Sequence, residues 1–361
     1  MIRRQVFRFL LFIFILSFCI SPNSVFAESD LERNYIIYTE DGYYLTERPN
    51  VQIGDFYISK DFKKYEIVYV DHEICHATAR FLYNVNKPKV DINTLPTPIA
   101  TTDKVICLYM THNDESYVPT DGTESVYGAG GIHDVANYFA NTLRNRGIET
   151  YIDETLHIPH DSYAYSRSKV TANNLIKSHE PNAIFDIHRD GTSRAYYIKN
   201  VDGKEQCMIR MVIGKANGSM EINEQFAVYL MAVAEKIAPN LFKDIYYASG
   251  HYNQGLHAKS LLFEMGSHMV EKELVMQSVD DLAKVVDTAL FATTVNSETG
   301  NLTINNNQTS EEVIIDKVLD DMYEENTQNS YGYVLIITLL SLGTILVVAL
   351  LSSLLKKKKT K

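Results

Sequence analysis

Hydrophobic and polar positions alternate in blocks between residues 104 and 293. Short apolar runs bounded by polar residues predict strands, and longer segments with apolar residues every three or four positions predict helices. The predicted strands are 105–110, 148–152, 183–187, 208–213 and 260–265, and the predicted helices are 135–146, 166–179, 221–237 and 271–291. Because these elements alternate, we expect an α/β fold with a largely parallel sheet flanked by helices.

The flanking segments have different patterns. Residues 31–84 contain strand-like runs broken by Gly and Asp, so we expect a small β-rich domain over 28–86. Residues 87–103 contain three prolines and predict a linker to the larger domain over 104–293. Residues 294–332 are polar and predict a stalk.

Both ends of the chain carry membrane-targeting patterns. Arginines precede an apolar run at 9–20, and the small residues that end at Ala27 predict a signal peptide over 1–27, with an uncleaved anchor as the alternative. Residues 333–355 carry no charge over 23 positions and predict a transmembrane helix. The lysines of 356–361 predict a cytoplasmic tail, so we expect the body of the chain on the outer side of the cell membrane.

The charge of the body excludes one large class of partners. The two predicted terminal segments, 1–27 and 356–361, hold eight of the 34 basic residues and none of the 45 acidic residues. The remaining chain therefore has 26 basic and 45 acidic residues, a net charge of −19. So acidic a body repels nucleic acid, and we expect no nucleic-acid partner.

Ionisable residues stand at the carboxyl ends of three predicted strands. His112 and Glu115 follow the first of them, His188 follows the strand at 183–187, and Glu264 lies in the last apolar run. Ligands bind at this edge of an α/β sheet. Two histidines and one carboxylate are a ligand set of hydrolytic zinc, which leaves a position open for water. We predict His112, Glu115 and His188 as zinc ligands and Glu264 as general base and acid.

Neighbouring residues have predicted supporting roles. Glu124, in a Gly-rich loop, is the alternative to Glu115 as carboxylate ligand. Asp186 is placed to orient the His188 ring, and Arg189 either holds a substrate carboxylate or pairs with Asp190. The remaining histidines lack ligand spacing and are expected on the surface, with His251 and His257 at the border of the cleft: His72, His76, His133, His157, His160, His179, His251, His257 and His268.

Several motifs over residues 104–291 resemble those of the stage II sporulation protein P family. These are THNDES (111–116), SYAYSRS (162–168), FDIHRD (185–190), VIGKAN (212–217), YNQGL (252–256) and LLFEMG (261–266). The resemblance implies a zinc amidase domain over 104–293 that cleaves the amide between N-acetylmuramic acid and L-alanine of peptidoglycan, with additional endopeptidase activity on stem peptides. By position it carries the ligand roles to His112, Glu115 and His188 and the catalytic role to Glu264.

The resemblance also implies a setting. Family members act with stage II sporulation protein D and other engulfment proteins while the mother cell engulfs the forespore. Familiar members are anchored near the N-terminus, whereas we expect this chain to be anchored at the other end. A zinc carboxypeptidase or endopeptidase acting on stem peptides, and a non-catalytic wall-binding protein, are the alternative functions.

Overall fold

The computed structural model describes residues 33–90, 103–161, 163–291, 294–295 and 302–303. The chain forms two compact units, one of residues 1–92 and 100–289 and the other of residues 93–99 and 290–361. In the second unit, strands β14 (Thr294–Val295) and β15 (Leu302–Thr303) pair antiparallel. All the residues analysed below belong to the first unit.

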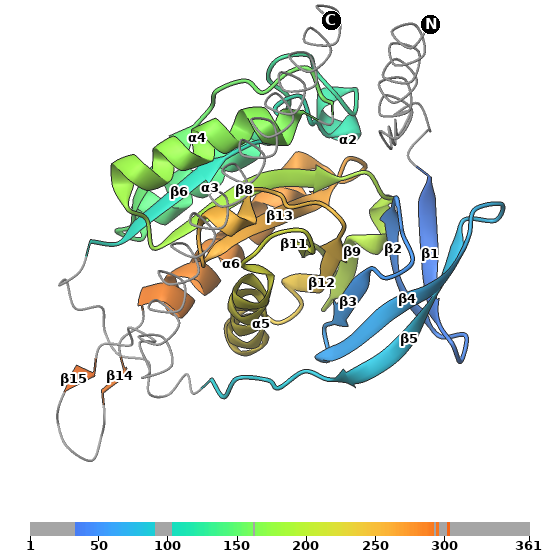
Figure 1. The fold of residues 1–361 in the computed structure, drawn as a ribbon. Coiled ribbons are helices and arrows are strands. Elements are labelled where there is room, and N and C mark those ends of the chain that lie inside the picture. The colour runs from blue at the N-terminus through green and yellow to red at the C-terminus, as the bar shows by residue number, and fades with distance from the viewer. Residues whose placement is uncertain (1–32, 91–102, 162, 292–293, 296–301, 304–361) are drawn as a thin grey trace, which may run out of the picture. The chain divides into compact units, whose positions relative to one another are not determined.

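A sheet of eleven strands forms the centre of the first unit (Figure 1). Its strands are β1 (Asn34–Thr39), β2 (Tyr44–Pro49), β3 (Phe56–Ser59), β4 (Lys63–Asp71), β5 (His76–Asn84), β6 (Val105–Tyr109), β7 (Glu149–Asp153), β8 (Ala183–Asp190), β11 (Ile209–Gly214), β12 (Phe242–Ala248) and β13 (Ser260–Ser267). They are arranged in the order β2-β1-β5-β4-β3-β12-β11-β13-β8-β6-β7. A separate hairpin joins β9 (Ile198–Val201) to β10 (Lys204–Cys207).

The α/β class is confirmed, but the sheet is mixed rather than largely parallel. Strands β7, β6, β8 and β13 are parallel neighbours, as expected. Strand β11 then runs antiparallel to β13, and β12 runs antiparallel to β3. The carboxyl ends of β6, β8 and β13 nevertheless point the same way, which is what the predicted site requires.

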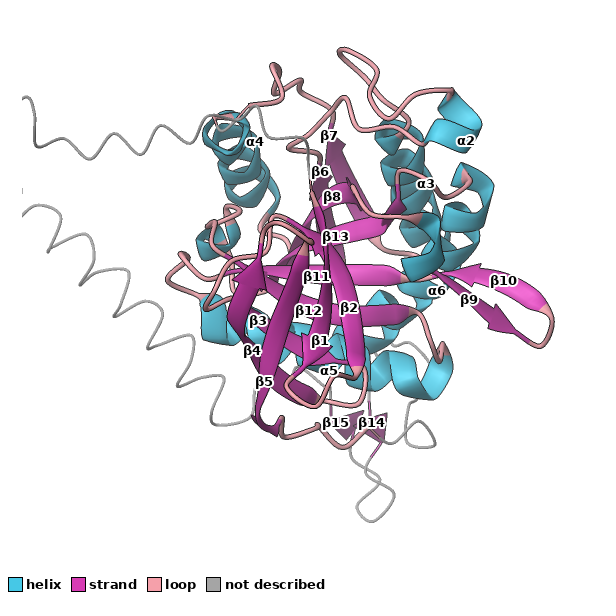
Figure 2. Ribbon diagram, turned by 90° about the vertical axis from the view of Figure 1, so that its right-hand side faces the viewer, coloured by secondary structure: helices cyan, strands magenta, loops and turns pink. Residues whose placement is uncertain are grey.

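Helices cover both faces of the sheet (Figure 2). They are α2 (Val118–Asp121), α3 (Ile132–Asn145), α4 (Ala164–His179), α5 (Met220–Ile237) and α6 (Lys272–Phe291), with short 3₁₀ turns η2 (Arg194–Tyr196) and η3 (Gln254–Leu256). Strand β8 shows which helices cover which face, because successive side chains of a strand point to opposite faces of the sheet. Phe185 packs near rings of α3 and α5, whereas Ile184 packs with residues of α4.

The N-terminal strands do not form the separate small domain that we expected over 28–86. Strand β3 is hydrogen-bonded to β12, so strands β1 to β5 extend the central sheet. Buried residues of both parts share one apolar cluster, in which Ile37 and Ile67 join Val212, Tyr246 and Leu262. A strand edge that pairs with another segment buries its polar backbone groups, which explains why the two parts fold as one.

A buried arginine also connects the two parts. Arg210 of β11 is fully buried, and it donates to Asp244 Oδ1 (2.7 Å) and Asp190 Oδ2 (2.9 Å). Its Nη2 also donates to the Thr46 hydroxyl (2.7 Å) and to the Glu47 carbonyl (3.0 Å) of β2. Strand β2 therefore contacts β11 through Arg210, although the two strands are not neighbours in the sheet.

The predictions for the chain ends fall outside the described residues. These are the signal peptide (1–27), the transmembrane helix (333–355), the tail (356–361) and nearly all of the stalk (294–332); most of the linker (87–103) is also outside. Of the helices that the structure describes, none combines the length and apolar character needed to span a membrane.

We predict that Arg210→Met lowers the free energy of unfolding by about 3–5 kcal/mol, because the buried carboxylates of Asp190 and Asp244 lose their counter-charge. Urea denaturation followed by circular dichroism measures this change. The control is Arg80→Met, which removes an exposed ion pair with Glu66 (2.9 Å) and should cost at most about 1 kcal/mol. Equal effects of the two substitutions would contradict the role assigned to Arg210.

Candidate metal centre

Asp186 fixes the loop that follows β6. The backbone N–H of Thr111 donates to Asp186 Oδ1 (2.9 Å), and the Thr111 hydroxyl donates to Asp186 Oδ2 (2.6 Å). All three groups are buried. This clamp joins the end of β6 to β8, and the rings of the next residue, His112, and of His188 come to lie 4.9 Å apart between centroids.

Glu115 lies between the two imidazoles. Its Oε1 is 3.2 Å from His112 Nδ1 and 3.3 Å from His188 Nδ1. Its Oε2 accepts a hydrogen bond from the backbone N–H of Arg189 (2.9 Å). The structure thus brings together His112, Glu115 and His188, the three side chains that the sequence predicts as ligands.

The charges in this cluster favour a cation. Burial opposes the ionised form of Glu115, but the His188 imidazole and the hydrogen bonds from His112 and His188 hold the pKa of this carboxyl well below its usual range. Burial also opposes protonation of His188, yet Asp186 and Glu115 raise the pKa of its imidazole well above the ordinary value. Burial lowers the pKa of His112 to about 4, so this ring is neutral and keeps a lone pair for a metal.

The donor set therefore fits a divalent metal ion. Metal ligands must be deprotonated, and a cation between two carboxylates takes over the electrostatic role of a proton on His188. The second nitrogen of His188, Nε2, is 3.0 Å from Asp186 Oδ1, although the angle is not that of a hydrogen bond. A carboxylate behind a ligating imidazole orients the ring and strengthens it as a ligand.

Glu264 stands beside this cluster on the neighbouring strand. It is the direct partner of His188 in the parallel pairing of β13 with β8, so both side chains point to the same face. Burial, with added repulsion from Asp190 and Glu115, raises the pKa of Glu264 to about 8. Its Oε2 is shielded from water and has no hydrogen-bond partner among the described residues. A carboxyl with such a pKa can both take up and release a proton near neutral pH.

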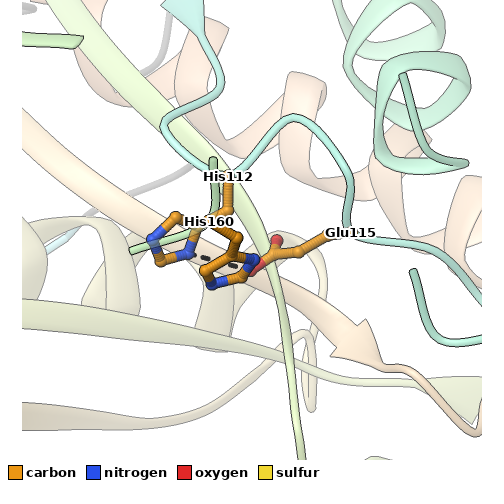
Figure 3. Close-up of side chains that lie close together, drawn as sticks. All are labelled: His112, Glu115 and His160. Carbon is orange, nitrogen blue, oxygen red and sulfur yellow. Dashed lines mark hydrogen bonds and ion pairs between the residues drawn. The ribbon is translucent and has the colours of Figure 1, made fainter. Parts of the chain in front are cut away.

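His160 is exposed, as the sequence predicts, but it also lies at the site, which the sequence analysis did not predict. Its ligand nitrogen, the one of His112 and an oxygen of Glu115 lie within 4.8 Å of one another. Figure 3 shows the three side chains close together. The rings of His112 and His160 are stacked, with centroids 3.8 Å apart, and His160 Nδ1 is 2.9 Å from Asp114 Oδ1. His160 follows β7, whose carboxyl end lies at the same edge as those of β6 and β8; that position was the signal in the sequence.

His160 and His188 therefore compete for the place of the third ligand. His188 is buried on a strand, and its Nε2 lies 3.0 Å from Asp186 Oδ1, whereas His160 is exposed on a loop and its Nδ1 lies 2.9 Å from Asp114 Oδ1. A rigid, buried ligand with a carboxylate behind it is the better preorganised of the two. Burial and the nearby Asp186 carboxylate are the features in favour of His188, whereas the group of ligand atoms that lie within 4.8 Å of one another contains His160 with His112 and Glu115.

The residues with predicted supporting roles take different positions. Arg189 Nη2 donates to the backbone carbonyl of Glu124 (3.0 Å). Asp190 accepts hydrogen bonds from Tyr197 (2.7 Å) and Arg210 (2.9 Å), so its partner is Arg210. The Glu124 side chain is exposed, in contrast to that of Glu115. Glu115 is therefore the carboxylate that lies against both imidazoles.

Two other histidines test the prediction that they lie on the surface: His157 contradicts it, and His251 agrees with it. His157 is buried rather than exposed, with ring nitrogens 2.7 Å from the Met110 carbonyl and 2.8 Å from the Thr171 hydroxyl. His251 is exposed, and its ring centroid is 6.4 Å from that of Tyr165, which itself packs near His112. The loop before β13 thus does reach the surroundings of the site.

Comparisons with known proteins give a consistent family assignment. The sequence model of the family described as stage II sporulation protein P (SpoIIP) matches residues 62–287. The curated stage II sporulation protein P of Bacillus subtilis (strain 168) is 29% identical over 181 residues, which are 45% of this chain and 45% of that protein. The match therefore spans less than half the length of that relative.

Solved structures of amidases resemble about half of this chain. The CwlD amidase of Clostridioides difficile, in complex with the GerS lipoprotein, has a TM-score of 0.36 and 12% identity and covers 52% of this chain and 95% of its own. The N-acetylmuramoyl-L-alanine amidase of Clostridium difficile 630 has a TM-score of 0.31 and 14% identity, covering 52% and 95%. The amidase AmiC2 of Nostoc punctiforme has a TM-score of 0.31 and 9% identity, covering 53% and 97%.

We predict that Glu115→Gln abolishes stoichiometric binding of a divalent metal, because the amide loses the negative charge that balances the cation. Glu124→Gln should bind metal as the wild type does. Elemental analysis of the purified variants after metal loading and dialysis measures the content. Full metal content in Glu115→Gln together with loss in Glu124→Gln would reverse the assignment of the ligand.

Proposed function

The chain belongs to the stage II sporulation protein P family, and we propose that it is a zinc-dependent peptidoglycan amidase of sporulating cells. The observation that carries the proposal is the buried Glu115 carboxylate beside two imidazoles, with Glu264 one strand away. Two histidines and a carboxylate form a ligand set of hydrolytic zinc enzymes, and a nearby carboxyl of raised pKa is the proton carrier that such enzymes need.

The arrangement of the side chains supports the following proposed roles. His112, Glu115 and His188 would hold the metal, and Asp186 would keep the His188 ring in position. When bound, zinc acidifies water and polarises the scissile carbonyl. Glu264 accepts the proton that the attacking water loses and delivers it to the leaving amine, so its carboxyl is again ionised at the end of the cycle.

We propose as the scissile bond the amide between the lactyl group of N-acetylmuramic acid and L-alanine, which the family resemblance implies. Hydrolysis of this bond leaves a free lactyl carboxylate on the glycan and a free amine on the stem peptide. Endopeptidase cleavage within stem peptides is a second activity of the same site. A carboxypeptidase would release single C-terminal amino acids instead, so the products distinguish these reactions.

The location and partners belong to the same proposal. We propose that the body lies outside the cell membrane, held by the apolar segment 333–355, and acts with stage II sporulation protein D and other engulfment proteins. The arginines near the start and the lysines at 356–361 support this orientation. Protease added to intact protoplasts should then digest the body and leave the tail; protection of the body would contradict it.

We predict that Glu264→Gln lowers the rate of peptidoglycan cleavage by about 10²–10⁴-fold, because the amide cannot carry the proton. Chromatography and mass spectrometry of digested muropeptides measure the release of stem peptides from glycan strands. Metal content and thermal unfolding of the variant should match the wild type, and Glu73→Gln, an exposed carboxylate on the turn between β4 and β5, should retain full activity.

The product pattern decides between the proposed functions. Glycan with unsubstituted lactyl groups supports the amidase, whereas intact lactyl amides with shortened peptides identify a peptidase. If the zinc-loaded wild type and the Glu264→Gln variant both leave peptidoglycan unchanged, this result would favour a non-catalytic wall-binding protein.

A further inference from the structure

A cavity outside the metal centre contains a lysine without a partner. The cavity measures about 440 Å³ and shares no lining residue with the metal centre. Its walls include Tyr44 and Leu45 of β2, Tyr57 of β3, Tyr196 of η2 and Lys243 of β12. The Tyr44 and Tyr196 rings are stacked, with centroids 5.7 Å apart.

A β-bulge places Lys243 in this cavity. In the pairing of β11 with β12, Ile209 lies opposite Phe242 and Arg210 lies opposite Asp244, so Lys243 is the extra residue. A bulge leaves one residue unpaired and turns its side chain out of the regular alternation, and such irregularities are frequent next to functional sites. As a result, both side chains lie close to β2: Lys243 lines the cavity with Tyr44 and Leu45, and the Asp244 carboxylate accepts a hydrogen bond from Thr46.

The Lys243 ammonium is shielded from water but unpaired. Its Nζ lies 4.6 Å from the centroid of the Tyr197 ring and 5.7 Å from that of Tyr196. It forms no hydrogen bond or ion pair with any described residue. Burial, with added repulsion from Arg210, lowers the pKa of Lys243 to about 8, so the group is still largely charged at neutral pH.

Lys64 shows what a satisfied lysine looks like in this protein. Its Nζ also lies 4.6 Å from a tyrosine ring, that of Tyr247, and the residue is buried. In contrast to Lys243, it has a carboxylate partner, Glu224 Oε2, at 2.7 Å. Because aromatic faces alone compensate a buried ammonium only in part, Lys64 carries the counter-ion that Lys243 lacks.

The carboxylates near Lys243 have other partners, and the buried Glu47 among them accepts a hydrogen bond from the backbone of Ser193. Asp244 accepts from Arg210 and Thr46, and Asp190 accepts from Arg210 and Tyr197. At the rim, Asp61 pairs with Lys63. None of these carboxylates forms a hydrogen bond or an ion pair with Lys243, so its ammonium keeps an open position for a partner. This unpaired ammonium and the tyrosine walls of the cavity are complementary to a carboxylate carried on an organic group.

We propose that this cavity binds a carboxylate of the peptidoglycan stem peptide, with Lys243 as its counter-ion and the stacked Tyr44 and Tyr196 as an apolar wall. The proposal rests on the proposed function for the choice of ligand. Tyr197 connects the cavity to the strand that carries His188. Its ring contacts Lys243, and its hydroxyl donates to Asp190, two residues after His188 on β8. The cavity is thus a substrate-binding subsite contributed in part by the N-terminal strands.

Calorimetric titration of the full, zinc-loaded chain with a free stem tripeptide (L-alanyl-γ-D-glutamyl-diaminopimelate) tests the subsite. Lys243→Met should weaken binding by about tenfold or more, because a desolvated charge pair is lost. Lys64→Met, the matched control, should bind the peptide as the wild type does. The same tripeptide with its carboxylates amidated should bind the wild type as weakly as the acid form binds Lys243→Met.

Thermal unfolding separates a binding role from a structural one. Lys243→Met should not lower the melting temperature, since an unpaired buried charge is removed, whereas Lys64→Met should lower it, since Glu224 is left unpaired. Unchanged peptide affinity in Lys243→Met, or equal affinity for the amidated peptide, would overturn the subsite. Cleavage of peptidoglycan by the wild type is measured independently, so absence of cleavage with Lys243-dependent binding would count against the amidase and not against the subsite.

Discussion

The site depends on one ionised carboxylate kept away from water. Glu115 can remain charged in its buried position only because His112, His188 and the Arg189 backbone N–H surround it. An isolated buried carboxylate would instead become protonated. The clamp of Thr111 on Asp186 and the pairing of His188 with Glu264 serve the same centre, since they fix the three strand ends from which these groups project.

The N-terminal strands have a larger part in this arrangement than their position in the sequence suggests. Thr46 and Glu47 of these strands accept hydrogen bonds from Arg210, and Arg210 in turn donates to Asp190 at the end of β8. The same strands supply Tyr44 and Tyr57 to the cavity of Lys243. Much of this β-rich segment precedes residue 62, where the match to the family model begins. The strands that carry the candidate site therefore depend on residues outside the matched region for their packing.

Hydrophobic periodicity was sufficient to predict the strands and helices that carry the site, and the strand ends predicted His112, Glu115, His188 and Glu264 together. It did not predict β12, because Lys243 and Asp244 interrupt the apolar pattern and are accommodated only by the bulge and by Arg210. It also could not predict the fusion of the β-rich segment with the sheet, which arises from long-range pairing of β3 with β12. His160 was missed because it lies seven residues after the end of β7, so its place at the same edge of the sheet was a weak signal; the fold brings its ring against that of His112.

The central claim is that a metal ion is bound between β6 and β8 by His112, Glu115 and His188. A crystal structure of the zinc-loaded chain, with anomalous data at the zinc edge, tests it most directly. The claim predicts one ion about 2.0–2.2 Å from nitrogen atoms of His112 and His188 and from a Glu115 oxygen, with Glu264 nearby but not bound. An ion held by His160 and Asp114, with His188 not coordinated, would contradict it.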